Sequence, residues 1–153
     1  MLTLDKVYDA QRVLKDNIRK TDLIYAPALS EKAQIYLKAE NLQTTGSFKV
    51  RGAYYKISRL SDEQKKRGII ACSAGNHAQG VALSAQKNGI ESAIFIPSTA
   101  PISKIEATRK YGAKIMLVDG VYDDAYAEAV KYQEETKGEF IHPFDDIDII
   151  AGQ

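Results

Sequence analysis

The sequence predicts an α/β fold: a three-layer αβα arrangement with a four-stranded parallel sheet, preceded by a helical and extended arm. Three observations support this prediction. From Gly68 onward, short apolar runs alternate with segments of helical periodicity. The connections between them are as short as those of βαβ units, whose strands pair in parallel. The apolar runs read as buried strands, which is typical of a parallel sheet covered by helices on both faces.

Length and charge narrow the possible functions. The chain has 153 residues, enough for one domain with a core, and its net charge of +1 gives no argument for nucleic acid or an acidic membrane surface as a partner. No apolar run is long enough to span a bilayer, and residues 1–6 lack the pattern of a signal peptide. The single cysteine, Cys72, cannot form an internal disulfide, which fits a reducing cytoplasm, and we interpret it as a small buried hydrophobe. The two histidines and this cysteine are too far apart in the sequence to indicate a zinc site.

The arm is predicted to begin with a helix that Thr3 caps and that ends near Asn17. Residues 21–29 are expected to be extended near Pro27, because a proline disfavours helix in the residue before it. Residues 35–40 read as a strand. This strand leads into the segment on which the functional interpretation depends.

That segment is residues 47–53, Ser-Phe-Lys-Val-Arg-Gly-Ala, which opens a helix after a polar, turn-prone approach. Thr45 or Ser47 can cap the helix, and Lys49 then lies in its first turn. A cation there opposes the helix dipole at a cost of up to about 1 kcal/mol, which lowers the pKa of the lysine. A lower pKa helps to keep the amine neutral, and imine chemistry needs a neutral amine. Position alone does not decide the role of Lys49, because most lysines are solvated surface residues.

A second segment, residues 72–80, follows the apolar run of residues 68–71 and precedes a helical run. A strand that passes through small residues into a helix presents free backbone amides, which form an anion site. Ser73 adds a hydroxyl group and Asn76 an amide to this site. Gly75 and Gly80 are spaced as in a nucleotide-binding P-loop, but Val81-Ala82 follows instead of Lys-Ser, so a P-loop is excluded.

The rest of the chain continues the alternation. The helix from Asn76 is expected to stop at Asn88-Gly89, because glycine favours the left-handed conformation that ends helices. A further helix is predicted around residues 123–136, where Tyr126, Ala129, Val130 and Gln133 share a face. The other predicted elements are strands at residues 92–96, 114–118 and 140–142, a helix at residues 102–111, and a last helix that begins near residue 147.

Several polar residues have simpler structural interpretations. His77 is expected to orient its loop rather than to act as an acid or a base. His142 is interpreted as structural, Tyr54 and Tyr55 as packing residues, and residues 65–67 as a solvated turn. The acidic residues 145–148 are expected to start a helix, because carboxylates complement the positive end of its dipole.

Residues 41–53 followed by residues 73–80 resemble the threonine dehydratases, also called threonine ammonia-lyases, of the fold type II pyridoxal-phosphate enzymes. The resemblance implies that Lys49 bonds covalently to pyridoxal 5'-phosphate, that Phe48 lies beside the cofactor ring, and that Asn76 hydrogen-bonds the ring hydroxyl. It implies that the substrate carboxylate is bound by the loop Ser73, Ala74, Gly75, Asn76 and His77. The family's glycine-rich phosphate loop and its serine or cysteine partner for the pyridine nitrogen have no counterpart in these residues.

The resemblance further implies conversion of L-threonine to 2-oxobutanoate and ammonia, and of L-serine to pyruvate. Residues 1–52 are expected to pack with a large domain, residues 53–153 to form the small domain, and the whole to be an amino-terminal fragment that is inactive alone. Homo-oligomers are expected, because apolar residues near the end lack cover. A serine racemase is an alternative, although that relative has a serine where this chain has Ala74. The non-catalytic alternative is an isolated small domain that only folds or oligomerises.

Overall fold

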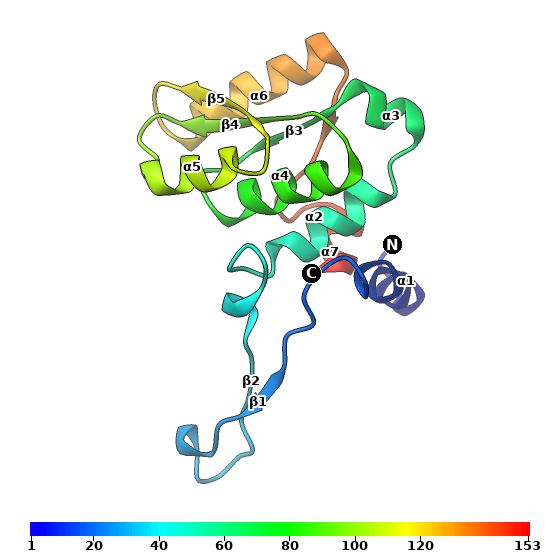
Figure 1. Cartoon of the computed structure of the whole chain (residues 1–153), viewed down its shortest axis with the longest axis vertical. Helices are drawn as coiled ribbons and strands as arrows, with labels where there is room; N and C mark the ends of the chain where they lie inside the picture. Colours follow the sequence, from blue (N-terminus) through cyan, green and yellow to red (C-terminus); the bar gives the residue numbers. More distant parts are fainter.

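A four-stranded parallel sheet with strand order β5-β4-β3-β6 lies between two layers of helices, in the upper part of the view in Figure 1. The computed structural model describes residues 1–153. The register pairs Ile69 with Ser92 on one side and with Glu139 on the other. This confirms the predicted fold class. The strands are β3 (Ile69–Cys72), β4 (Ser92–Pro97), β5 (Lys114–Val118) and β6 (Glu139–Phe140).

Helices cover both faces of the sheet and create two separate clusters of buried side chains (Figure 1). On one face, Ala71 and Ile94 pack with residues of α4 (Asn76–Asn88), α5 (Ile102–Arg109) and α2 (Lys49–Ser58). On the other face, Cys72 and Phe95 pack against Ala125 and Ala129 of α6 (Tyr122–Thr136). Successive side chains of a strand point to opposite faces of the sheet, so each strand packs against both helix layers.

The helix ends follow the local chemistry of the sequence. Gly89 ends α4 in the left-handed conformation (φ 66°), as predicted. Ser61 and Gln64 form a capping box that starts α3 (Asp62–Arg67). The prediction for residues 65–67 was therefore wrong, because these residues form the last turn of a helix and not a turn between elements.

The arm consists of α1 (Leu4–Leu14), capped by Thr3, and a two-stranded hairpin of β1 (Leu23–Tyr25) and β2 (Tyr36–Lys38). Two short 3-10 helices, Pro27–Leu29 and Glu40–Leu42, accompany the strands, so residues 21–29 are extended only in part. Helix α1 stops three residues before the predicted end, and Figure 1 shows the hairpin projecting away from the domain. Its strands leave several large apolar side chains exposed: Leu23, Ile24, Tyr25, Tyr36 and Leu37.

The last helix, α7 (Ile147–Gly152), packs against α2 through two glycines. A Cβ on Gly152 would lie 2.8 Å from Cα of Gly52, and a Cβ on Gly52 would lie 2.6 Å from the carbonyl oxygen of Ile149. Because only glycine permits this approach, the crossing brings the end of the chain to the start of α2. None of the helices has the length and apolar composition needed to cross a bilayer.

Candidate active site

Lys49 is the first residue of α2, and its amine is directed to the carboxyl end of the sheet. Nζ donates a hydrogen bond to the carbonyl oxygen of Pro143 (2.7 Å) and another to Oε1 of Gln153 (3.4 Å). It also lies 5.2 Å from the ring centre of Phe48, whose side chain is exposed. Partial burial lowers the pKa of Lys49. The direction matches the sequence prediction, but the cause is loss of solvent around the amine.

The start of α2 is stabilised in a different way from the one predicted. The N-cap residue is Phe48, which offers no side-chain hydrogen bond. Instead, Oγ of Ser47 accepts from the backbone amide of Lys49 (3.2 Å), and the hydroxyl of Thr45 donates to the carbonyl of Ser47 (3.4 Å). Both predicted residues therefore stabilise the backbone that leads into Lys49, although neither occupies the N-cap position.

The predicted Ser73–His77 loop consists of residues 73–75, which join the carboxyl end of β3 to α4, and of the first two residues of α4. Oγ of Ser73 accepts from the amide of Gly75 (3.2 Å), which folds the loop into a turn. Gly75 is the N-cap residue and gives α4 no side-chain cap, so the first amides of the helix are free to bind an anion. Asn76 is exposed at the first position of α4, and a Cβ on Gly75 would meet no atom within 4 Å. The loop thus leaves open space before uncapped amides.

His77 anchors this loop to the neighbouring strand. Its side chain is buried (4% exposed), and Nε2 lies 2.8 Å from the carbonyl oxygen of Ile141. Burial lowers the pKa of His77 to about 4, so the ring is neutral at pH 7 and Nε2 carries the proton donated to that carbonyl. Nδ1 is buried without a hydrogen-bond partner. A neutral anchor is consistent with the predicted role in orienting the loop.

The backbone after β6 brings the two motifs together. The carbonyl of Ile141 binds His77 of the second motif, and the carbonyl of Pro143 binds Lys49 of the first. Helices α2 and α4 also contact each other directly, because a Cβ on Gly80 of α4 would lie 3.1 Å from the backbone carbonyl carbon of Lys49 in α2. Sequence reasoning missed Pro143 and Gln153 as neighbours of Lys49, and no local pattern marks a backbone carbonyl or a single glutamine as such.

The other candidate residues have structural roles. Cys72 is buried and burial raises the pKa of its thiol to about 11, which suits a packing residue. His142 accepts from the backbone amide of Asp145 (2.8 Å). The carboxylate of Asp146 caps α7, as predicted for the acidic run. Tyr54 and Tyr55 are buried and pack with α1, and no group of His, Cys, Asp and Glu side chains is arranged to hold a metal ion.

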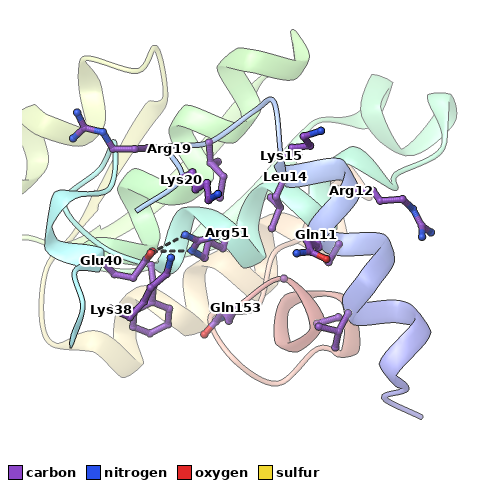
Figure 2. Close-up of a pocket in the computed structure, with 16 residues that line it drawn as sticks. Gln11, Arg12, Leu14, Lys15, Arg19, Lys20, Lys38, Glu40, Arg51 and Gln153 are labelled. Atoms are coloured by element: carbon purple, nitrogen blue, oxygen red, sulfur yellow. Dashed lines mark hydrogen bonds and ion pairs between the residues drawn. The ribbon is translucent and has the colours of Figure 1, made fainter. Parts of the chain in front are cut away.

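A cavity lies elsewhere, between α1, the end of the hairpin, the start of α2 and the end of α7 (Figure 2). It measures about 670 Å³, and of the predicted site residues only Phe48 lines it. Inside it, Arg51 forms two hydrogen bonds with Glu40, at 2.7 and 2.8 Å (Figure 2). This ion pair lowers the pKa of Glu40 to about 2 and fixes the arm to α2.

Comparisons with known proteins agree on one family. A family model described as "Pyridoxal-phosphate dependent enzyme" matches residues 14–153. L-threonine ammonia-lyase from Thermotoga maritima is 54% identical in an alignment of 155 positions that covers 100% of this chain and 39% of that relative. The structure of maize serine racemase superposes on this chain with a TM-score of 0.93 at 33% identity. The superposition covers 99% of this chain and 46% of the racemase chain. Threonine deaminase isoform 2 from Solanum lycopersicum gives 0.88 at 36% identity, with 98% and 46% covered. This chain spans less than half the length of each of them.

Proposed function

Because this chain belongs to the family of pyridoxal-phosphate dependent enzymes, we propose that it carries the lysine-bearing part of a threonine ammonia-lyase. The enzyme would convert L-threonine to 2-oxobutanoate and ammonia, and L-serine to pyruvate and ammonia. The observation that carries the proposal is that one short segment after β6 holds both motifs: the carbonyl of Pro143 accepts from Lys49, and the carbonyl of Ile141 accepts from His77. The 54% identity to a threonine ammonia-lyase supports the choice of substrate.

The residues of the site fit pyridoxal phosphate. A primary amine with a lowered pKa, as at Lys49, is the group that reacts with an aldehyde. Phe48 offers an exposed aromatic face next to that amine, and the Asn76 amide, exposed and free of other partners, would bind the ring hydroxyl. When bound, the cofactor supplies an electron sink for a carbanion at the substrate α-carbon.

The Ser73–His77 loop would bind the substrate carboxylate. The uncapped amides at the start of α4 and the hydroxyl of Ser73 are donors of the kind that a carboxylate accepts. His77 would keep the loop in place without adding charge. Held in this way, the α-carbon of the amino acid would be oriented toward the amine that removes its proton.

Lys49 would act as the base. Its neutral amine would take the α-proton of L-threonine and return a proton to the β-hydroxyl, which would leave as water. The released enamine would then add water and lose ammonia to give 2-oxobutanoate. The same steps on L-serine would give pyruvate, because the two amino acids differ only by the methyl group on the β-carbon.

The racemase alternative is weaker because of Ala74. Racemisation needs a second acid–base group on the opposite face of the α-carbon, and a methyl group cannot carry a proton. The high TM-score to a serine racemase is matched by a similar score to a threonine deaminase. Formation of D-serine is therefore not expected.

The arm supports a further part of the proposal. We expect residues 1–52 to pack against a second domain and residues 53–153 to form the small domain, because the hairpin exposes a row of large apolar side chains. A glycine-rich phosphate loop is also needed, and the ten glycines of this chain are scattered. We therefore expect no turnover by this chain alone. We also expect association into homo-oligomers through the exposed apolar surface. We propose a reducing cytoplasm as the compartment, because a lone buried thiol stays reduced there.

Trapping experiments test the role of Lys49. The chain is mixed with pyridoxal phosphate, reduced with borohydride and mapped by mass spectrometry, with Lys49→Ala and the exposed-site control Lys131→Ala. We expect the label mainly at Lys49. For the activity, residues 1–153 are joined to the remaining length of the Thermotoga relative, and 2-oxobutanoate, pyruvate and D-serine are measured. Turnover of L-threonine that survives Lys49→Ala would overturn the proposal, as would D-serine as the main product.

A further inference from the structure

The side chain of Gln153 forms a closed set of contacts with Lys49 and Pro143. Its Oε1 accepts from Nζ of Lys49 (3.4 Å), and its Nε2 donates to the carbonyl oxygen of Pro143 (3.3 Å). That carbonyl also accepts from Nζ of Lys49 (2.7 Å). Pro143 and Gln153, which come from two different segments, therefore meet at the amine of Lys49. The amide orientation is fixed by chemistry, because an amine needs an acceptor and a carbonyl needs a donor.

The backbone places Gln153 at this point. Gly152 contacts Gly52 and the carbonyl oxygen of Arg51, at 2.8 and 2.9 Å from the position that a Cβ would occupy. The side chain of Gln153 in turn lies over Gly52, where a Cβ would come within 2.9 Å of its Cγ. A side chain at either glycine would push α7 away from α2. The close crossing is thus the reason that the Gln153 amide reaches Lys49.

The contacts determine where the lone pair of the amine points. A neutral primary amine has two N–H groups and one lone pair around its nitrogen. Pro143 and Gln153 supply two acceptors, one for each N–H group of Lys49. The lone pair must then occupy the remaining tetrahedral direction, away from both acceptors. A base or nucleophile needs its lone pair free in this way.

We propose that Gln153 is a positioning residue that holds the free amine of Lys49 against Pro143 with its lone pair directed away from both. The chemical use of this arrangement rests on the proposed function, but the arrangement itself does not. A glutamine suits the role because it accepts and donates at once without charge. Leucine would do neither, and asparagine is one methylene shorter. Glutamate would accept from the amine but offer no donor to Pro143.

Competitive acetylation tests this role in the chain as it stands. Trace acetic anhydride is applied from pH 6 to 11, and mass spectrometry gives the labelling of Lys49 relative to the exposed Lys110. The variants are Gln153→Leu, Gln153→Asn and Gln153→Glu, with Gln86→Leu and Gln86→Glu as controls at the far end of α4. Loss of an acceptor disfavours the ammonium form, so we expect the Leu and Asn variants to raise the acid dissociation constant of Lys49 about threefold. We expect Gln153→Glu to lower it by at least as much, and the controls to leave it unchanged.

The proposal is overturned if the Asn and Leu variants titrate like the wild type, or if the Gln86 controls shift Lys49 equally. Thermal melting by circular dichroism verifies that each variant is folded. Gln153 is an exposed residue. If the leucine variant does not fold, the asparagine variant, which retains an amide, provides the test. The labelling needs neither cofactor nor substrate. Failure of the proposed enzyme activity would therefore not change the result, and an unchanged Lys49 titration would leave the proposed activity standing.

Discussion

The carbonyl oxygen of Pro143 lies 2.7 Å from Nζ of Lys49, although the two residues are 94 positions apart in the sequence. The contact joins the start of α2 to the segment that follows β6. His77 binds the same segment at Ile141, so one stretch of backbone sets the positions of both motifs. The geometry of the candidate site therefore depends on β6 being correctly paired.

His77 is expected to make stability depend on pH. Its folded pKa of about 4 lies below the ordinary value of 6.5, so the unfolded chain binds the proton more readily. Stability is then fully present above pH 6.5 and falls, by on the order of 3 kcal/mol, as the pH drops toward 4. His77→Gln should remove this part of the pH dependence. Urea unfolding between pH 4 and 7 measures it. His142→Gln, the matched control, should keep the wild-type slope, and an equal slope in His77→Gln would contradict the prediction.

Glu40 should act in a lower pH range. Its pKa falls from 4.5 to about 2, chiefly through the hydrogen bonds from Arg51, so the pair stabilises the fold above pH 4.5. This contribution, on the order of 3 kcal/mol, disappears as the pH falls toward 2. In urea unfolding, Glu40→Gln should be less stable than the wild type at pH 7 and equally stable near pH 2. Glu106→Gln, which breaks an exposed ion pair with Arg109, should cost less than about 1 kcal/mol at either pH.

Gly152→Ala tests the crossing of α2 and α7. The added methyl would lie 2.8 Å from Cα of Gly52, so the helices must separate, at a cost of about 1–3 kcal/mol. Chemical denaturation measures the free energy of unfolding. Ile150→Ala, on the same helix but 42% exposed, should cost less than about 1 kcal/mol. If the two variants lose the same stability, the close contact of the glycines is not important to the fold.

Ile24→Lys tests association through the hairpin. Ile24 is 46% exposed in a short strand whose free edge and apolar side chains favour contact with other chains. We expect sedimentation velocity to show less association of the variant over a range of concentrations, with unchanged stability in urea. Ile102→Lys, exposed on α5, provides the control. Equal loss of association in both variants would indicate a general effect of charge.

The sequence predicted the sheet, its helices and their order well, because β-branched runs such as Ile69-Ile70 and stops such as Gly89 are local signals. It predicted less of the arm, whose three-residue strands are too short to show a period. The error at residues 65–67 was avoidable, since Ser61 and Gln64 have the spacing of a capping box. The roles of Ile141, Pro143 and Gln153 were not predictable, because their contacts depend on how distant segments pack.

The strand order has a consequence for synthesis of the protein on the ribosome. β3 can pair with β4 soon after both have emerged, but its other neighbour, β6, is made much later, and the register joins Ile69 to Glu139. Such long-range pairing is slow to form. During translation, one edge of β3 stays open, and Lys49 and His77 lack the carbonyls that hold them, until α6 and β6 have left the exit tunnel. A pause before that point would hold the nascent chain with its central strand half paired.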